Sequence, residues 1–325
     1  AKRYIVVSVD VPSGLDTSTG IVLGQTVKAD ITVTFAYPKI GLFEYPGSEY
    51  SSKIIVADIG IPKLNPIFPK DASELPKQTS MPKAGPLNII DASLVSKLIP
   101  RRPTRSHKGS FGDLFIVGGS SGMTGAPVLA GRGALRVGAG LVRLGVPSEL
   151  MNFVDSANHE TITIGLKQNK QACLSQDALF EIISIYRRSS CLAIGPGLSL
   201  NNETAQLVKK LISSLKNEKN GAPVIIDADG LNAISDAPNI LNALKIPVIV
   251  TPHPGERARL TGRSPADVQK MRAKTAIDFA KKFNVIVVLK GSYTVVAHPK
   301  RGIWINSTGN PGMASAGMGD VLTGA

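Results

Sequence analysis

The sequence contains few cysteines and few aromatic residues, and it lacks a long apolar run. Cys173 and Cys191 are its two cysteines, and no metal-binding or redox spacing joins them, which argues against a zinc site or structural disulfide and favours a reducing compartment. No apolar run approaches the roughly 18 residues that a transmembrane helix needs, so we expect a cytoplasmic protein with no membrane partner. Residue 1 is not Met and Ala325 falls one turn into a predicted helix, so we expect both ends to be cut.

The residues that are present are typical of a soluble globular protein. The chain has 325 residues, of which 43% are hydrophobic and 19% are charged, enough for one large domain or two smaller ones. It has 37 Lys and Arg residues against 24 Asp and Glu residues, and the net charge of +13 favours an anionic partner. Because the basic residues are dispersed and no basic patch is interleaved with aromatic residues, we expect no nucleic-acid partner.

A proline-rich stretch divides the chain into two parts. Six prolines fall between Pro62 and Pro86, among Lys, Ser and Asn residues, and they predict a linker over residues 63–87. Residues 1–62 contain short apolar runs without amphipathic helices long enough to cover a sheet, so we interpret them as the tail of a domain. The strands predicted there are 4–9, 31–35 and 53–57.

Residues 88–325 alternate apolar runs with helical periods. This alternation predicts an α/β domain with a doubly wound, mostly parallel sheet and helices on both of its faces. Residues 293–297 and 302–306 are expected to form an antiparallel hairpin at the edge of that sheet. The other predicted strands are 114–117, 141–146, 192–194, 224–226, 248–250 and 285–289, and the predicted helices are 125–137, 203–215 and 265–282.

Four turns follow these strands, at the end of the sheet where ligands bind in such folds. Residues 118–126 form a glycine-rich loop that either binds a phosphate or only needs positive φ angles, and the loop lacks the Lys of a P-loop. Residues 195–197 form the second turn. In the third turn, Asp227 and Asp229 are candidates for binding a metal ion or a ribose hydroxyl, and we expect one of the two to cap the following helix instead.

The fourth turn places His253 between two prolines, directly after the predicted strand 248–250. Because proline stiffens the backbone, the imidazole is aimed rather than mobile. Two interpretations of this side chain stay open: contact with a ligand, or an ordinary helix cap.

The C-terminal run at 306–320 is rich in glycine and small residues and leads into a helix whose first turn carries Asp320. Several backbone N–H groups can converge there on a transferring phosphoryl group, while the carboxylate takes a proton from an attacking hydroxyl. This layout indicates a phosphotransferase, and the alternative is that Asp320 only caps the helix. Lys290 opens the run 290–294, which offers a cation and polar groups to a nucleotide or is a plain hairpin turn.

These motifs, taken in order, resemble a known family. Residues 88–325 contain S-H-K-G, G-G-S-S-G-M-T-G-A, G-P-G, D-A-D-G-L-N, T-P-H-P-G-E, L-K-G-S-Y-T and N-P-G-M-A-S-A-G-M-G-D. Together they are similar to the ADP- or ATP-dependent NAD(P)H-hydrate dehydratases, which have a ribokinase-like fold. Upstream, the segments V-D-V-P-S-G-L-D, A-D-I-T-V-T-F and D-I-G-I-P resemble the end of the Rossmann-like NAD(P)H-hydrate epimerase domain.

The resemblance implies that the chain repairs a damaged dinucleotide. In this family ADP or ATP, with Mg²⁺, phosphorylates the C6 hydroxyl of NADH hydrate or NADPH hydrate. Loss of phosphate, assisted by the ring nitrogen, then restores NADH or NADPH. The resemblance also implies a homo-oligomer, and the presence of both halves in one chain favours ADP over ATP.

The resemblance further implies roles for individual residues. Asp320 is the implied catalytic base. Contacts with the hydrated dinucleotide are implied for Ala126, Gly197, His253 and Asp320. The adenine nucleotide is implied to lie against Lys290, Gly291, Ser292, Tyr293, Thr294 and Gly319. In the part that resembles the epimerase, Asp10 is implied to face the hydrate and Ser13 to bind K⁺.

The chain departs from the family pattern in two places. Met318 stands where a small polar residue is usual, and we expect tolerance because backbone N–H groups act there. The epimerase part lacks its glycine-rich loop and catalytic carboxylate, so we expect no epimerase activity, and the dehydratase part ends five residues after Asp320. Two other functions stay open, a ribokinase-like kinase of a small metabolite such as a vitamin precursor and a non-catalytic nucleotide sensor.

Overall fold

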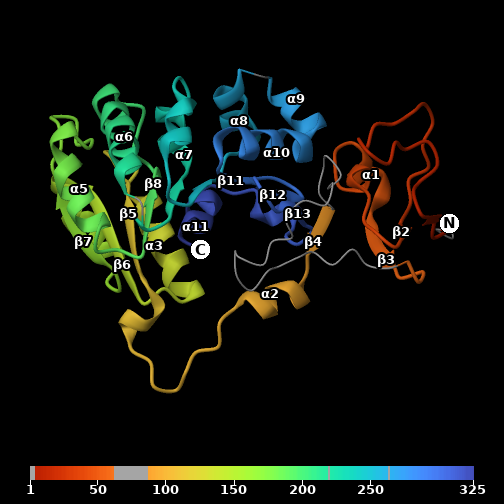
Figure 1. Cartoon of the computed structure of the whole chain (residues 1–325), viewed down its shortest axis with the longest axis horizontal. Coiled ribbons are helices and arrows are strands. Elements are labelled where there is room, and N and C mark those ends of the chain that lie inside the picture. Colours follow the sequence, from red (N-terminus) through yellow and green to blue (C-terminus); the bar gives the residue numbers. More distant parts are fainter. Residues whose placement is uncertain (1–3, 62–86, 219, 263) are drawn as a thin grey trace.

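The computed structural model describes residues 4–61, 87–218, 220–262 and 264–325. The predicted linker at 63–87 therefore lies outside the described residues except at Leu87, where a strand begins. Most of the structure is a ten-stranded sheet with helices packed against it (Figure 1). In order across this sheet, the strands are β4 (Leu87–Ile90), β13 (Gly302–Asn306), β12 (Thr294–His298), β11 (Ile286–Leu289), β10 (Val248–Val250), β9 (Val224–Ile226), β8 (Cys191–Ile194), β5 (Asp113–Val117), β6 (Leu141–Pro147) and β7 (Ile162–Leu166).

Every neighbouring pair in this sheet is parallel except the two that involve β12. The predicted mostly parallel α/β sheet is thus confirmed, and so is the hairpin, with Thr294 opposite Asn306. Its predicted place at the sheet edge is wrong, because β4 pairs with β13 outside it and brings Leu87 opposite Ile303. The pairing joins segments more than two hundred residues apart in the chain, a partnership that no local pattern specifies.

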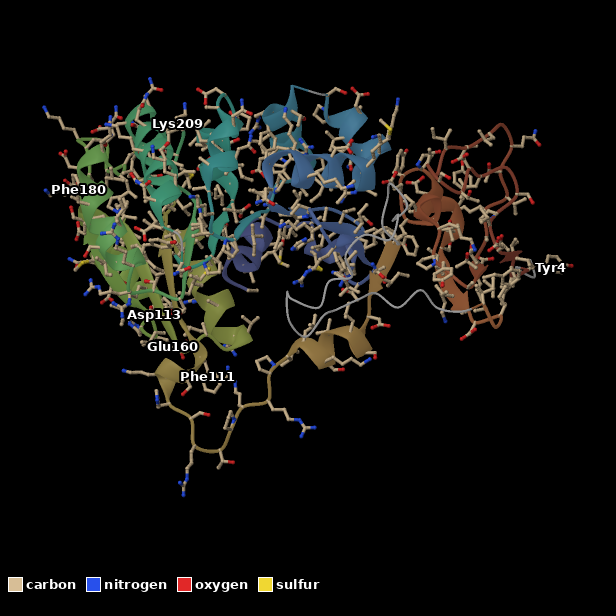
Figure 2. The ribbon with its side chains drawn as sticks, in the orientation of Figure 1. Tyr4, Phe111, Asp113, Glu160, Phe180 and Lys209 are labelled. Carbon is tan, nitrogen blue, oxygen red and sulfur yellow. The ribbon has the colours of Figure 1, made fainter. Side chains whose placement is uncertain are left out.

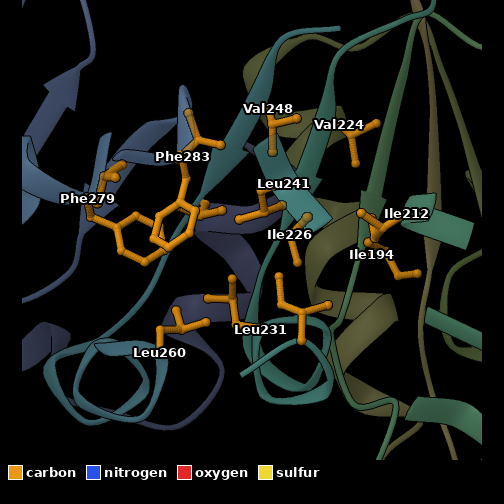
Figure 3. Close-up of a cluster of buried hydrophobic side chains, with 14 of the residues drawn as sticks. Ile194, Ile212, Val224, Ile226, Leu231, Leu241, Val248, Leu260, Phe279 and Phe283 are labelled. Atoms are coloured by element: carbon orange, nitrogen blue, oxygen red, sulfur yellow. The ribbon is translucent and has the colours of Figure 1, made fainter. Parts of the chain in front are cut away.

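Successive residues of β5 point to opposite faces of the sheet. Phe115 and Val117 belong to the larger hydrophobic cluster, whereas Leu114 and Ile116 belong to a second cluster on the other face. Both faces are therefore covered, as predicted. In the larger cluster, side chains of four helices pack on the strands, and Figure 3 shows them meeting, among them Leu231. These helices are α6 (Asn202–Ser214), α7 (Ala228–Ala233), α8 (Pro254–Thr261) and α10 (Arg272–Phe283).

The helices begin and end at residues suited to those positions. The Asn201 side chain accepts a hydrogen bond from the Glu203 N–H at the start of α6, and Gly138, with φ of 108°, ends α3. The helices are α1 (Gly47–Ser51), α2 (Ala92–Leu98), α3 (Gly125–Val137), α4 (Met151–Ala157), α5 (Leu179–Tyr186), α6 (Asn202–Ser214), α7 (Ala228–Ala233), α8 (Pro254–Thr261), α9 (Pro265–Lys270), α10 (Arg272–Phe283) and α11 (Met318–Gly324). Among them, none has both the length and the apolar composition needed to cross a bilayer.

The single helix predicted over 265–282 is wrong. It is divided into α9 and α10 at Met271, whose φ of −142° and ψ of 54° are not helical. Arg272, directly after the break, is buried, and its guanidinium donates to the carbonyl oxygens of Leu289 and Lys290 at 3.0 and 3.2 Å. A buried guanidinium needs such acceptors, and they are supplied by a strand end that is distant in sequence.

The outer surfaces of the helices carry exposed side chains. Phe180 on α5 is 84% exposed, and Figure 2 places it with Lys209 of α6 on the outside of the helical layer. Single exposed apolar side chains of this kind are normal in globular proteins.

The N-terminal part forms a separate parallel sheet of three strands, β1 (Val7–Val9), β2 (Ile31–Phe35) and β3 (Lys53–Ala57). The three predicted strands are thus present, although β1 is shorter than predicted. We call residues 4–61 the N-terminal unit. It packs against the large sheet and its helices, because its Leu42 and Phe43 are buried in the same hydrophobic cluster as the residues of α10 (Figure 1).

Glu44 is buried in the same contact between the N-terminal unit and α10, and its carboxyl group should make the stability of the protein depend on pH. Burial, opposed by a hydrogen bond from the Ala273 N–H and by the charge of Arg272, raises the pKa of the Glu44 carboxyl from 4.5 to about 7. Because the folded state holds this proton more tightly, the contribution to stability is complete below pH 4.5 and is lost as the pH rises through about 7. The shift corresponds to about 3 kcal/mol in the free energy of unfolding.

Glu44→Gln should remove this part of the pH dependence. Urea unfolding of both proteins at a series of pH values across that window measures it. Equal pH dependence in the two proteins would contradict the assignment.

Candidate active site

Three neighbouring parallel strands end at the same edge of the large sheet. Asp227 follows β9, Thr251 follows β10, and Lys290 follows β11. Since these strands are adjacent and parallel, their carboxyl ends bring the three side chains together although 63 residues separate the first from the last.

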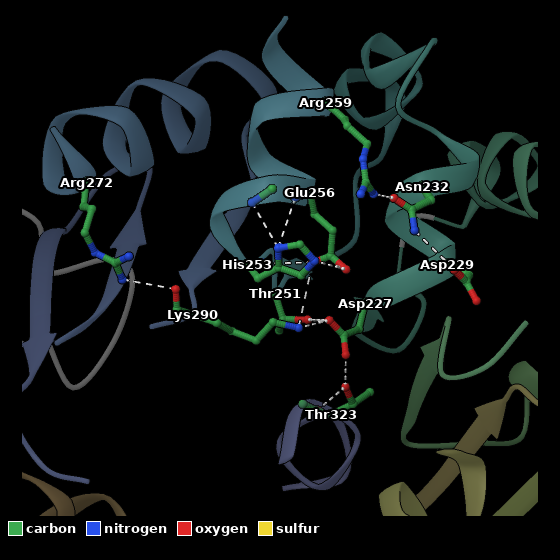
Figure 4. A network of polar contacts seen from close by, with 12 residues as sticks. Asp227, Asp229, Asn232, Thr251, His253, Glu256, Arg259, Arg272, Lys290 and Thr323 are labelled. Atoms are coloured by element: carbon green, nitrogen blue, oxygen red, sulfur yellow. Dashed lines mark hydrogen bonds and ion pairs between the residues drawn. The ribbon is translucent and has the colours of Figure 1, made fainter. Parts of the chain in front are cut away.

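Asp227 is the centre of this group (Figure 4). Its side chain is 1% exposed, and its Oδ1 accepts hydrogen bonds from Thr251 Oγ1 at 2.6 Å and from Lys290 Nζ at 2.7 Å. Its Oδ2 accepts from the hydroxyl of Thr323 in α11. Both carboxylate oxygens are therefore used, one to hold the Lys290 cation and the other to fix the helix that carries Asp320.

The expectation that one carboxylate of the third turn caps α7 is wrong. Asp227 occupies the position before the helix, but its side chain makes no capping hydrogen bond. The Asp229 carboxylate instead accepts from the backbone N–H of Ser199 at 2.9 Å and from Asn232 Nδ2 at 3.2 Å. It thereby ties α7 to the turn after β8.

Glu256 is the second buried carboxylate beside Lys290. Its Oε2 lies 3.9 Å from Lys290 Nζ, and its side chain is 6% exposed. Burial raises the pKa of Glu256, and the positive charge of Lys290 opposes that shift. Lys290 therefore lies between two carboxylates, with 18% of its side chain exposed.

His253 caps α8, which was one of the two interpretations of its setting. Its Nδ1 accepts hydrogen bonds from the backbone N–H groups of Gly255 and Glu256, and the backbone N–H of His253 donates to Glu256 Oε2. Since Nδ1 is an acceptor, the neutral ring carries its proton on Nε2, which lies 3.3 Å from Glu256 Oε1. The ring is fixed and still 49% exposed, so contact with a ligand stays a prediction.

Asp320 is the third residue of α11 and is partly buried. Burial raises the pKa of its carboxyl, repulsion by Asp227 and Asp229 raises it further, and Lys290 opposes the shift. These causes place Asp320 in the same charged group although no sequence pattern joins it to Asp227. A carboxyl with a raised pKa is closer to the working pH that suits a general base.

A cavity of about 580 Å³ adjoins Lys290. All six residues predicted to hold the adenine nucleotide line it, namely Lys290, Gly291, Ser292, Tyr293, Thr294 and Gly319. Met318, noted above as a departure from the family pattern, lines it as well. The volume falls in the range of small-molecule sites.

Gly291 allows the chain that lines this cavity to adopt its conformation. Its φ is +139°, and a Cβ on it would lie 2.8 Å from Arg272 Nη1.

Two of the predicted dinucleotide contacts also lie together. A Cβ on Gly197, whose φ is +64°, would lie 3.0 Å from the Ala126 Cβ, so the glycine-rich loop and the second turn touch. The Ser120 hydroxyl joins the same two segments by donating to the Gly197 carbonyl oxygen.

Asp10 lies apart in the N-terminal unit, where it accepts from Lys39 Nζ at 2.5 Å and from the Phe35 N–H at 3.0 Å. The hydrogen bond from Lys39 is the largest cause that lowers the pKa of Asp10. Ser13 is exposed on the same loop.

Sequence reasoning missed the roles of Thr251, Glu256 and Thr323, and it left Asp227 undecided. The first two lie in the motif T-P-H-P-G-E, where only the histidine drew attention. The available signal was their position immediately after or near a buried strand. Thr323 offered no signal, because its importance follows from the approach of α11 to Asp227.

The placement of α11 depends on glycines at its contact with α3. A Cβ on Gly133 would lie 2.4 Å from the Val321 carbonyl oxygen. We expect Gly133→Ala to lower the free energy of unfolding by about 1–3 kcal/mol because the helices must move apart. Chemical denaturation measures the change, with Gly125→Ala on the same helix as the control, since its Cβ would meet nothing within 4 Å. Equal losses in both variants would contradict this account.

Comparison with known proteins identifies the family. A sequence model described as NAD(P)H-hydrate dehydratase matches residues 114–325. The chain belongs to the NAD(P)H-hydrate dehydratase family. A second model, described as the YjeF-related protein N-terminus, matches residues 1–41.

Individual relatives agree with this family. The bifunctional NAD(P)H-hydrate repair enzyme Nnr of Moorella thermoacetica is 40% identical over 318 residues, which are 98% of this chain and 56% of that protein. The chain thus spans little more than half the length of this relative. The ADP/ATP-dependent NAD(P)H-hydrate dehydratase of Bacillus subtilis, co-crystallised with ATP and Mg²⁺, has a TM-score of 0.58 and 30% identity, covering 73% of this chain and 78% of that one.

A ribokinase-like superfamily protein of Enterococcus faecalis has a TM-score of 0.62 at 24% identity, covering 73% of this chain and 78% of that one. At that identity it supports the fold alone. The ribokinase-like fold predicted for this chain is confirmed.

Proposed function

We propose that this chain catalyses the nucleotide-dependent dehydration of NADH hydrate and NADPH hydrate to NADH and NADPH. The observation that carries the proposal is the group of Asp227, Lys290 and Asp320 beside a cavity of about 580 Å³, in a chain of the NAD(P)H-hydrate dehydratase family. ADP or ATP occupies that cavity against residues 290–294 and Gly319.

The hydrated dinucleotide is proposed to contact Asp320, His253 and the adjoining Ala126 and Gly197. These last two residues lie where the glycine-rich loop meets the second turn. The pairing of the loops supports a common surface for one ligand.

The chemistry assigned to Asp320 is general-base catalysis. Asp320 takes the proton of the C6 hydroxyl while that oxygen attacks the terminal phosphorus of the nucleotide. The bond from this phosphorus to its bridging oxygen breaks, and the shortened nucleotide keeps the electron pair. The positive charge of Lys290 offsets the negative charge of the phosphates.

The second half of the reaction restores the ring. Phosphate leaves C6 with the electron pair of the C–O bond, while the lone pair of the ring nitrogen fills the vacancy. Loss of a proton from C5 to solvent then forms the C5–C6 double bond. ADP and hydrate together give AMP, phosphate and the reduced dinucleotide, and ATP gives ADP in the same way.

Magnesium fits this site as an ion held mainly by the nucleotide. Within the described ranges, no group of three or more His, Cys, Asp or Glu side chains could hold a metal ion. Magnesium commonly binds through substrate phosphates and one or two carboxylates. Both oxygens of Asp227 already accept hydrogen bonds and both oxygens of Glu256 contact His253, so the phosphates of the nucleotide would be the main ligands of the ion. The ion would supply charge neutralisation at the phosphates.

For the rest of the chain, we propose the division into residues 1–62, a linker at 63–87, and a dehydratase domain at 88–325. The match of residues 1–41 to the YjeF-related N-terminus supports the first of these. The roles of Asp10 toward the hydrate and of Ser13 toward K⁺ stay predictions, as do a homo-oligomeric state, a cytoplasmic location and the preference for ADP.

Incubation with NADH hydrate and either ADP or ATP tests the proposed function. Recovery of the NADH absorbance, with release of phosphate in equal amount, is the expected result. Phosphoryl transfer to a small alcohol substrate without such recovery would indicate the ribokinase-like metabolite kinase instead. Nucleotide binding without any turnover would indicate a nucleotide sensor.

A further inference from the structure

Two consecutive residues of the N-terminal unit are buried beside the nucleotide loop, which we define as residues 290–294: Phe43 contacts the loop itself, and Glu44 contacts the start of α10. Phe43 and Glu44 are each 3% exposed. Neither residue belongs to the dehydratase motifs, and the predicted division of the chain assigns both to the other part. Their burial therefore reflects contacts with the dehydratase part of the chain.

Glu44 contacts the start of α10. Its Oε1 accepts a hydrogen bond from the Ala273 N–H at 2.6 Å, where a carboxylate also interacts favourably with the helix dipole. The neighbouring Arg272 attracts the Glu44 carboxylate. The first residues of α10 are thus fixed by a side chain of the N-terminal unit.

Arg272 in turn holds the beginning of the nucleotide loop. Its Nη2 donates to the carbonyl oxygen of Lys290 (Figure 4) and to that of Leu289, and its Nη1 donates to Gln269 Oε1. A Cβ on Gly291 would lie 2.8 Å from Nη1, so the guanidinium packs directly under the loop. The position of Arg272 therefore sets the backbone from which Lys290 extends.

Phe43 contacts the other end of the loop. Its ring lies edge-on to the Tyr293 ring, with centroids 5.5 Å apart and an interplanar angle of 78°. Tyr293 has a φ of +53°, an uncommon conformation that needs support from its surroundings, and it lines the cavity. Phe43 thus contacts one end of the five-residue loop directly, and Glu44 acts on the other end through Arg272.

We propose that Phe43 and Glu44 are positioning residues that preorganise the nucleotide loop, so that the N-terminal unit sets the affinity of the dehydratase site for its adenine nucleotide. This inference rests on the proposed function, because it takes the cavity to be the nucleotide site. A loop that is ordered before binding loses less conformational entropy when the nucleotide arrives. The contacts touch the nucleotide side of the site and leave the loops at Ala126 and Gly197 unaffected.

The test compares Glu44→Ala and Phe43→Leu with the unchanged chain. Each variant should raise the KM and the dissociation constant for ADP or ATP by about 3- to 10-fold, the size expected for losing the order of one or two side chains. The KM for NADH hydrate and the kcat at saturating nucleotide should stay within about twofold. Glu49→Ala is the control, because Glu49 lies exposed on α1 of the same unit.

Two further measurements separate positioning from general loss of structure. Glu44→Gln retains an oxygen that accepts from the Ala273 N–H, so it should restore most of the nucleotide affinity. Phe43→Leu and Tyr293→Leu, measured singly and together, should be non-additive in nucleotide affinity, which would support the proposal even if Glu44→Ala does not fold.

The outcomes are distinguishable. If the unchanged chain neither binds nucleotide nor dehydrates NADH hydrate, the proposed function fails. If it does both, while the variants keep full nucleotide affinity or lose all kinetic parameters equally, the positioning proposal is overturned.

Discussion

Asp320→Asn is expected to reduce turnover of NADH hydrate by about 10²- to 10⁴-fold, the range for loss of a general base. Asn keeps the shape of the side chain but cannot accept the proton of the C6 hydroxyl. Nucleotide affinity should change little, because Lys290 and the loop that follows it are untouched. Steady-state rates and calorimetric titration with ADP and ATP measure the two quantities.

The pH dependence of the rate adds a second test of Asp320. Burial raises the pKa of its carboxyl, and the base works only when deprotonated, so the rate should fall as the pH drops through that raised pKa. The Asn variant should lack this acidic limb. Asp278→Asn is the matched control, since Asp278 is half exposed and pairs with Lys274 on the surface. Full turnover in Asp320→Asn would assign the base to another residue.

Asp227→Ala is expected to lower the free energy of unfolding by about 3–5 kcal/mol, the cost of breaking a buried ion pair from one side. The change leaves the Lys290 cation without its partner at 2.7 Å and removes the acceptor of Thr251 and Thr323. It should also abolish turnover, because the ammonium group and α11 both lose their anchor. Urea unfolding and the dehydration assay measure the two effects.

Asp236→Ala is the control for this loss. Asp236 pairs with Lys209 at the same distance of 2.7 Å, but it is 69% exposed. Pairs of this kind contribute at most about 1 kcal/mol, so Asp236→Ala should be nearly silent. Asp227→Asn should fall between the two, since its amide keeps one acceptor oxygen. If both Ala variants lower the free energy of unfolding by similar amounts, burial does not explain the stabilising effect of the Asp227–Lys290 pair.

Much of the fold could be predicted because it depends on local patterns. The apolar runs at 224–226 and 248–250 are strands of the stated length, and Gly125 and Val137 bound a helix as predicted. Each of these runs has three consecutive β-branched residues followed by polar turn residues. This pattern is typical of a buried parallel strand. The turns that follow these strands were therefore the right places to search for the site.

Local patterns do not identify which side chains within those turns belong to the site. Asp227 and Asp229 are two residues apart, and the sequence left open which of them functions. Asp227 turns toward Lys290 and Thr323, whereas Asp229 turns toward Ser199. The direction of each carboxylate depends on the neighbouring strands and helices. The sequence around the two residues does not specify which strands and helices these are.

The break at Met271 has the same origin. The periodicity of 265–282 fits one helix, and the residues there permit it. Two helices form because the Glu44 carboxylate accepts from the Ala273 N–H and the Arg272 guanidinium donates to carbonyl oxygens at the end of β11. Tertiary hydrogen bonds to buried charges outweigh a weak local preference.

Local patterns in the chain establish the alternation of strands and helices and the turns that carry polar residues, and the ordered motifs mark the NAD(P)H-hydrate dehydratase family. Only the folded structure brings together the hydrogen-bonded group around Asp227, whose partners lie 24, 63 and 96 residues away along the chain. It also decided the contact of Glu44 with α10, across 229 residues. Periodicity and turn propensity act over a few residues, whereas these contacts depend on strand order and helix packing, which exist only once the chain has folded.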